Sequence, residues 1–181
     1  MRILTTLPAC GLALVLGATN AAEAQIDFGK MPVGCSWTTS YSGGQVVTET
    51  FLGKKSGKYR TKVTQADNPK ALVRHSFYDA KGRLVRKVWA DGNWEKFAPY
   101  SCFDSLGSCT YRYTNSGGAD QKIASKTVAK GKGFAVKAGP TGGTAYPDEY
   151  FEVGAFGVMT KNKASNYSAR LIALTNCDAA S

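Results

Sequence analysis

The chain contains a single histidine, His75, and histidine is the side chain best suited to act as a general base near neutral pH. In an extended strand, alternate side chains point to the same face, so His75 would lie with Val73 and Phe77 on an apolar face. The hydroxyl of Ser76 would point the other way, and a histidine base needs a nucleophile or an orienting carboxylate nearby. The pattern therefore favours a core or rim histidine with one hydrogen bond over a catalytic base.

Three carboxylates, Asp148, Glu149 and Glu152, cluster beside Tyr150 and Phe151. Aromatic neighbours can raise the pKa of one carboxyl group, and two carboxyl groups with different pKa values supply the acid and base of a glycosidase. Asp148 and Glu152 would share a face on a strand, whereas Glu149 and Glu152 would share one on a helical turn. The simpler interpretation is an acidic surface segment that pairs with lysines.

Basic residues are the most abundant charged groups, and they are concentrated in part of the chain. The net charge is +10, and residues 54–96 hold twelve Lys and Arg against four Asp and Glu. A second run of lysines occupies residues 122–137. Strand alternation places Lys58, Arg60 and Lys62 on one face. Hairpin pairing would extend this face to Arg74 on the next strand, and then either to Arg83 and Lys87 or to Arg86. We predict as ligand-binding residues Lys58, Arg60, Lys62, Arg74, Arg83 and Lys87.

A basic sheet face of this kind attracts phosphate or carboxylate groups, so the predicted partners are an anionic lipid, a glycan or an acidic protein. The alternative is that lysines on solvent-facing strands keep a secreted β domain soluble and protect its sheet edges. The tyrosines and tryptophans do not form the regular stacking pattern of a nucleic-acid platform, so we do not expect nucleic acid as a partner.

Four cysteines follow residue 24, and an even number in an exported chain predicts two disulfides. Three connectivities are possible. A short loop with turn-forming residues separates Cys102 from Cys109, which favours a bond between these two and leaves Cys35 to pair with Cys177. The chain lacks the CxxC pairs and the histidines of a zinc site, so we expect neither a metal nor a cofactor.

The elements that must position these residues are short segments rich in Val, Thr, Tyr, Phe and Trp, separated by turn signals such as Asp91-Gly92. They predict strands over Ser36–Tyr41, Gln45–Leu52, Lys58–Gln65, Ala71–Tyr78, Arg83–Ala90, Trp94–Ala98, Cys109–Thr114, Ile123–Val128, Gly133–Ala138, Tyr150–Val153 and Ala169–Thr175.

Short turns between these segments indicate that neighbouring strands pair antiparallel. No segment shows the helical repeat of apolar residues, so at most one short helix is expected, at Pro147–Phe151. The fold class is therefore all-β, with an antiparallel meander that forms a barrel or a strongly curved sheet. A two-sheet sandwich is the alternative.

The first 24 residues have the features of a secretory signal peptide. Arg2 precedes an apolar stretch, and small residues at Ala22 and Ala24 match a cleavage site after Ala24. We interpret Cys10 as part of that apolar stretch and not as a lipidation site. No apolar run reaches the roughly 20 residues of a transmembrane helix. We expect one β-rich domain over residues 25–181, located in the periplasm or outside the cell.

Two functions follow from these observations. The favoured one is a non-enzymatic binding or envelope-associated module that uses its basic sheet face for an anionic or amphipathic ligand. The alternative is a small hydrolase of envelope polymers that works through a carboxylate pair or through His75.

Overall fold

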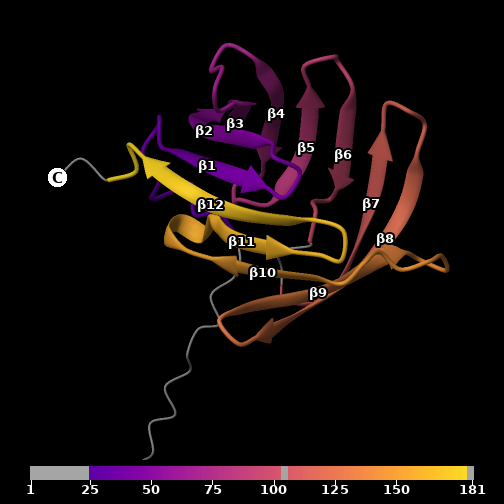
Figure 1. Ribbon diagram of the computed structural model, residues 1–181. Coiled ribbons are helices and arrows are strands. Elements are labelled where there is room, and N and C mark those ends of the chain that lie inside the picture. Colours follow the sequence, from indigo (N-terminus) through magenta and orange to yellow (C-terminus); the bar gives the residue numbers. More distant parts are fainter. Residues whose placement is uncertain (1–24, 103–105, 179–181) are drawn as a thin grey trace, which may run out of the picture.

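The described residues, 25–102 and 106–178 of a computed structural model, form a closed antiparallel β-barrel (Figure 1). The predicted all-β meander is confirmed as a barrel, and the alternative of a two-sheet sandwich is wrong. In these two ranges the twelve strands are β1 (Ser36–Tyr41), β2 (Val46–Lys55), β3 (Lys58–Gln65), β4 (Leu72–Tyr78), β5 (Leu84–Trp89), β6 (Trp94–Ala98), β7 (Gly107–Asn115), β8 (Asp120–Lys130), β9 (Gly133–Pro140), β10 (Glu149–Val153), β11 (Met159–Lys163) and β12 (Ser168–Thr175).

Each strand pairs antiparallel with the next strand in the chain, and β1 pairs with β12 to close the barrel. Side chains alternate between the inner and the outer wall, as β2 illustrates: Val47, Glu49 and Phe51 are buried, while the residues between them are partly exposed. Closure leaves no strand edge free to pair with another chain.

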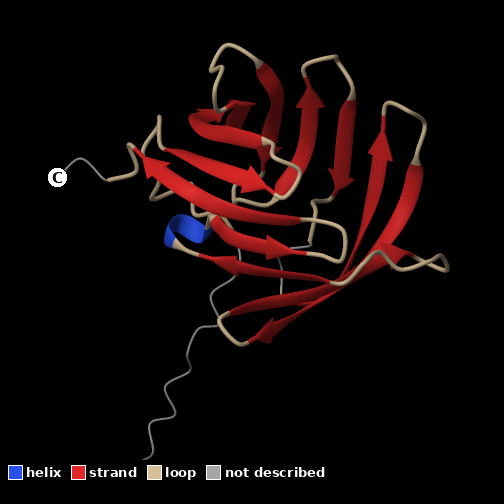
Figure 2. Ribbon diagram, in the orientation of Figure 1, coloured by secondary structure: helices blue, strands red, loops and turns tan. Residues whose placement is uncertain are grey.

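One strand and one helix differ from the sequence-based prediction. β11 was not predicted, because Lys161 and Lys163 give it a polar composition and its inward residue, Asn162, is itself polar. The short helix expected at Pro147–Phe151 is wrong, because Phe151 belongs to β10 and packs against Phe134 of β9 with ring centroids 5.2 Å apart. Figure 2 shows the only helical turn in the described ranges, η1 (Ala155–Gly157), between β10 and β11.

Because successive strands run in opposite directions, the turns after β1, β3, β5, β7, β9 and β11 lie at one end of the barrel, which we call the hairpin end. The opposite end, which we call the terminal end, holds the start of β1 and the end of β12. In Figure 1 the arrowhead of β12, in yellow, marks the terminal end.

The segment that precedes β1 packs across the terminal end. Phe28 lies in a cluster of aromatic rings, with centroid distances of 4.9 Å to Phe51, 5.2 Å to Tyr59 and 4.8 Å to Tyr78. The backbone of this segment also approaches Gly82 so closely that a Cβ atom there would lie 2.0 Å from the carbonyl oxygen of Ile26. Only glycine fits such an approach. The segment is therefore an integral part of this end of the barrel.

A second apolar cluster fills the inner side of β6 to β10. Its buried residues include Phe97 and Tyr111, whose ring centroids are 6.1 Å apart, together with Ile123 and Val136. The two clusters together form the apolar core of the barrel.

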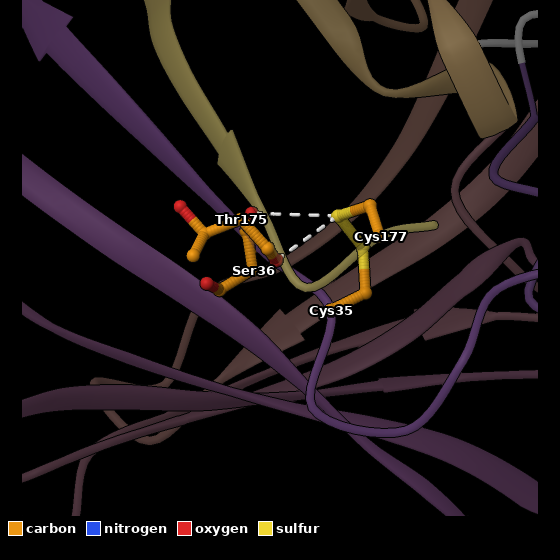
Figure 3. Close-up of a disulfide and its surroundings, with 4 residues drawn as sticks. All are labelled: Cys35, Ser36, Thr175 and Cys177. Atoms are coloured by element: carbon orange, nitrogen blue, oxygen red, sulfur yellow. Dashed lines mark hydrogen bonds between the residues drawn. A yellow bond between two sulfur atoms is a disulfide. The ribbon is translucent and has the colours of Figure 1, made fainter. Parts of the chain in front are cut away.

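Both disulfides join the cysteines that the sequence favoured. Cys35–Cys177 spans 142 residues and ties the start of β1 to the end of β12, and Cys102–Cys109 spans seven residues. Figure 3 shows the Sγ atom of Cys177 beside the carbonyl oxygens of Thr175 and Ser36, at 3.3 and 3.6 Å. Two such bonds are consistent with an oxidising compartment.

The predicted signal peptide, residues 1–24, lies outside the described residues. Within the described ranges, no helix has the length and apolar character that crossing a membrane requires.

We expect the Cys35→Ser/Cys177→Ser variant to lose roughly 5 kcal/mol of unfolding free energy, since this bond closes a loop of 142 residues. Cys102→Ser/Cys109→Ser should lose only about 2 kcal/mol, because its loop is short. Urea unfolding followed by tryptophan fluorescence measures both values. Equal losses in the two variants would contradict this account of how the barrel is stabilised.

Candidate functional site

The outer wall of β3 carries the cations that the sequence placed on one face. Thr61 and Val63 are fully buried and define the inner wall of this strand. Lys58, Arg60 and Lys62 alternate with them and therefore point outward. The shared face of these three cations is therefore as predicted, while ligand binding by them stays a prediction.

Strand register extends this outer wall across three more strands. Arg60 lies opposite Phe77 of β4, Phe77 opposite Arg86 of β5, and Arg86 opposite Lys96 of β6. Directly opposite residues in an antiparallel pair share a face, so these four side chains form one continuous row.

A second row runs beside the first. Lys62 lies opposite His75, His75 opposite Val88, and Val88 opposite Trp94. Together the two rows cross four strands, and the cations on this side of the barrel come from three of them, β3, β5 and β6. We name as the outer basic face the five cations Lys58, Arg60, Lys62, Arg86 and Lys96.

A groove lies within the outer basic face. It has a volume of about 620 Å³, within the range of about 300–1,000 Å³ found for small-molecule sites. Positive charge and an indole ring therefore border the same groove. Its lining residues are Lys58, Asp79, Val85, Arg86, Trp94, Lys96, Phe97, Ala98 and Pro99.

One acid, Asp79, lines this groove, and its salt bridge is to Arg83 and not to a cation of the face. In the described part of the chain, none of the five cations of the outer basic face forms a salt bridge.

Two residues predicted for this face lie instead on the inner wall, and their placement is a correction. His75 lies opposite Lys62 and therefore points outward with it. Its neighbour Arg74 points inward, where its guanidinium lies 3.8 Å from the carboxylate of Glu49. Lys87 also points inward and forms an ion pair with Glu95 at 3.1 Å. The prediction assigned the register between β3 and β4 one residue out of phase, and such a shift moves a side chain to the opposite wall.

Arg83 lies in the hairpin between β4 and β5, and its guanidinium is already engaged. Its Nε donates a hydrogen bond to Asp79 at 2.7 Å, and the guanidinium lies 3.4 Å from the ring centroid of Tyr100. Partial burial of Asp79 opposes ionisation, but hydrogen bonds from the side chain and backbone of Arg83 and from the backbone of Lys81 outweigh it and lower the pKa of Asp79. Arg83 therefore stabilises the hairpin beside the groove.

His75 faces outward, not into the apolar interior as its sequence neighbours suggested. Its Nδ1 lies 3.3 Å from the carbonyl oxygen of Thr61, the single hydrogen bond expected of a structural histidine. Within the described ranges no carboxylate or hydroxyl forms a hydrogen bond with this ring.

The three candidate carboxylates have separate partners. Glu149 points inward, where it accepts hydrogen bonds from Tyr167 at 2.7 Å and from Asn162 at 3.1 Å. Asp148 pairs with Lys137 at 3.3 Å, and Glu152 lies 3.5 Å from Lys161 on the outer wall. Burial and the neighbouring Glu149 raise the pKa of Tyr167, which therefore stays protonated and donates to that carboxylate.

Sequence reasoning missed Glu49, an acid on the inner wall of β2. Its carboxylate accepts hydrogen bonds from Thr61 at 2.5 Å and Tyr78 at 3.1 Å and faces Arg74. Burial and the charge of Glu49 raise the pKa of Tyr78. The sequence could have indicated this position, because Glu49 alternates with the apolar residues Val47 and Phe51 on the same face of the strand.

In the described part of the chain, no three His, Cys, Asp or Glu residues come together as metal ligands. Comparison with known proteins finds no family model, no curated protein and no solved structure that matches this chain.

Glu49→Ala should lower the free energy of unfolding by about 3–5 kcal/mol, because it leaves Arg74 and two inward hydroxyl groups without their acceptor. Glu152→Ala is the matched control: it removes the same group from the outer wall, where its partners are Lys161 and the hydroxyl group of Tyr150, and should cost only about 1 kcal/mol. Chemical denaturation of both variants tests the difference, and equal costs would contradict the role of Glu49.

Asp79→Asn should lower the unfolding free energy at pH 7 by about 1 kcal/mol, since asparagine keeps the turn but loses the charge facing Arg83. The pKa of Asp79 is depressed in the folded protein, so its contribution is present above the usual value of 3.8 and disappears as the pH falls through the lower folded value. The difference in unfolding free energy between parent and variant should therefore be constant from about pH 5 to 7 and shrink below pH 3.8.

Denaturant unfolding from pH 2 to 7 measures that difference. In an Arg83→Gln background the same substitution should have a much smaller effect at pH 7. A difference that is unchanged at pH 2 would contradict the assignment to the charge of Asp79.

Proposed function

We propose that the protein is a non-enzymatic binding module that holds a phosphate- or carboxylate-bearing component of the cell envelope on its outer basic face. The observation that carries the proposal is the set of five cations from β3, β5 and β6 that surround or adjoin one groove without a salt bridge among the described residues. Like charges on one face repel each other, and an anion relieves this repulsion.

The residue types on this face suit an extended anionic ligand. Arg60 and Arg86 carry planar guanidinium groups that can bind phosphate or carboxylate with two parallel hydrogen bonds. Trp94 and Phe77 lie among them and offer rings against which a sugar or an apolar portion of a ligand packs. An anionic lipid head group or an acidic glycan combines both features.

The proposed location is the periplasm or the exterior of the cell. A signal peptide that ends near Ala24 would deliver the chain there, and two disulfides suit an oxidising compartment. An envelope component would then be present at high local concentration.

The alternative, a hydrolase of envelope polymers, has less support. Its candidate acids each have a separate partner, Lys137 for Asp148, Tyr167 for Glu149 and Lys161 for Glu152. A glycosidase needs two carboxyl groups directed at one bond.

To test the binding function, we would measure retention of the purified mature protein on heparin and on phosphatidylglycerol vesicles. The Arg60→Gln/Arg86→Gln variant should bind about tenfold more weakly, because it removes two cations on either side of Phe77. Parent binding should also fall steeply between low and physiological salt, since exposed charges are screened over about 10 Å at 0.1 M salt.

The matched control is Lys161→Gln/Arg170→Gln, which removes two cations that lie directly opposite each other on β11 and β12. It has the same net charge as the test variant and should keep most of the binding. If both variants lose affinity equally, binding depends on overall charge and the proposed face is wrong.

A further inference from the structure

A second groove crosses the outer wall of β8, β9, β10 and β11, away from the outer basic face. Strand register aligns one residue from each strand: Val128 lies opposite Ala135, Ala135 opposite Tyr150, and Tyr150 opposite Lys163. Three apolar or aromatic side chains thus form a strip that ends at a lysine.

This strip is accessible to solvent. Val128 is 45% exposed, which makes it one of the few large apolar side chains on the outside of the barrel. The hydroxyl group of Tyr150 donates a hydrogen bond to Glu152 at 3.2 Å, which fixes the tyrosine side chain on the outer wall.

Lysines border the strip. Lys126 of β8 lies directly opposite Lys137 of β9, although like charges in directly opposite positions destabilise a sheet. Lys137 is paired with Asp148 at 3.3 Å, while Lys126 forms no salt bridge in the described part of the chain. An anion between the two ammonium groups would offset their repulsion.

The strip and the lysines line one groove of about 620 Å³, which we call the lysine groove. Of its two acids, Glu149 is engaged with Tyr167 on the inner side, and Asp148 pairs with Lys137 at the border of the groove. The other three lysines of the lining, Lys126, Lys130 and Lys163, form no salt bridge among the described residues. The lining therefore offers an apolar floor with a positive border. Its residues are Lys126, Val128, Lys130, Ala135, Val136, Lys137, Asp148, Glu149, Tyr150, Lys163, Ala164 and Ser165.

We propose that the lysine groove binds a single-chain amphiphile with an anionic head group. The hydrocarbon chain lies along Val128, Ala135 and Tyr150, and the carboxylate or phosphate lies between Lys126 and Lys137. Burial of the exposed strip supplies a hydrophobic contribution that a purely polar anion cannot provide, and the lysines discriminate against neutral head groups.

This site is distinct from the outer basic face, because the two grooves share no lining residue. The lysine groove combines an apolar strip with its charges, which suits one lipid chain, whereas the outer basic face presents rows of charge. Either proposal can fail without the other.

The test is isothermal titration of the mature protein with dodecyl phosphate and with dodecanoate, each below its critical micelle concentration. Both should bind at one site, and the ratio of their dissociation constants shows whether the groove prefers phosphate or carboxylate. Lys126→Gln/Lys137→Gln should weaken binding at least about tenfold, through loss of two charge-assisted contacts. Val128→Asp should abolish it, since it puts a negative charge on the strip.

Lys122→Gln is the matched control, because Lys122 lies on the same strand and the same wall as Lys126 but outside the lysine groove. It should bind dodecyl phosphate like the parent, and so should Arg60→Gln/Arg86→Gln. The melting temperature of Lys126→Gln/Lys137→Gln should be close to that of the parent, since relief of the like-charge contact offsets loss of the exposed Lys137–Asp148 pair. Weaker binding would then not reflect unfolding.

Three results would overturn the proposal. If dodecyl maltoside binds as tightly as dodecyl phosphate, the head-group charge does not contribute to binding. If inorganic phosphate binds as tightly, the hydrocarbon chain does not contribute. Full affinity in Lys126→Gln/Lys137→Gln would place the ligand elsewhere.

Discussion

The pairing of β1 with β12 is the constraint on which the rest of the molecule depends. It joins strands from opposite ends of the chain, and Cys35–Cys177 holds them together at the terminal end. Without this closure the meander would be an open sheet with two free edges. Once it is closed, every strand has an inner and an outer wall, and each charged side chain must lie on one of them.

Charged side chains have different surroundings on the two walls. On the inner wall, Arg74 faces Glu49, and Lys87 faces Glu95, because a charge withdrawn from water needs a partner. On the outer wall, solvent stabilises unpaired cations, so the chain can keep rows of them without nearby acids. Unpaired outer cations form the outer basic face, and in the lysine groove they stand beside Lys137, which pairs with Asp148. The inner pairs contribute to the barrel itself.

Most of the architecture was predictable because it depends on local patterns. Trp94–Ala98 and Lys58–Gln65 have the alternation and the flanking turns of strands, and both occur with the predicted bounds. β11 was not predictable in this way, since a strand with lysines outside and Asn162 inside has no apolar alternation. Its place is determined by its neighbours β10 and β12, which a local pattern does not contain.

By itself, the sequence determined the all-β class, the order of pairing along the meander and the outward row on β3, because these follow from period-two alternation and short turns. It favoured the disulfide pairing that the structure has, because a short loop separates Cys102 from Cys109. Only the tertiary structure decided which wall Arg74, His75 and Lys87 occupy, because wall assignment depends on register between strands and a shift of one residue reverses it. The same holds for the lysine groove. Its strip joins residues of four strands that are neighbours only after the barrel has formed.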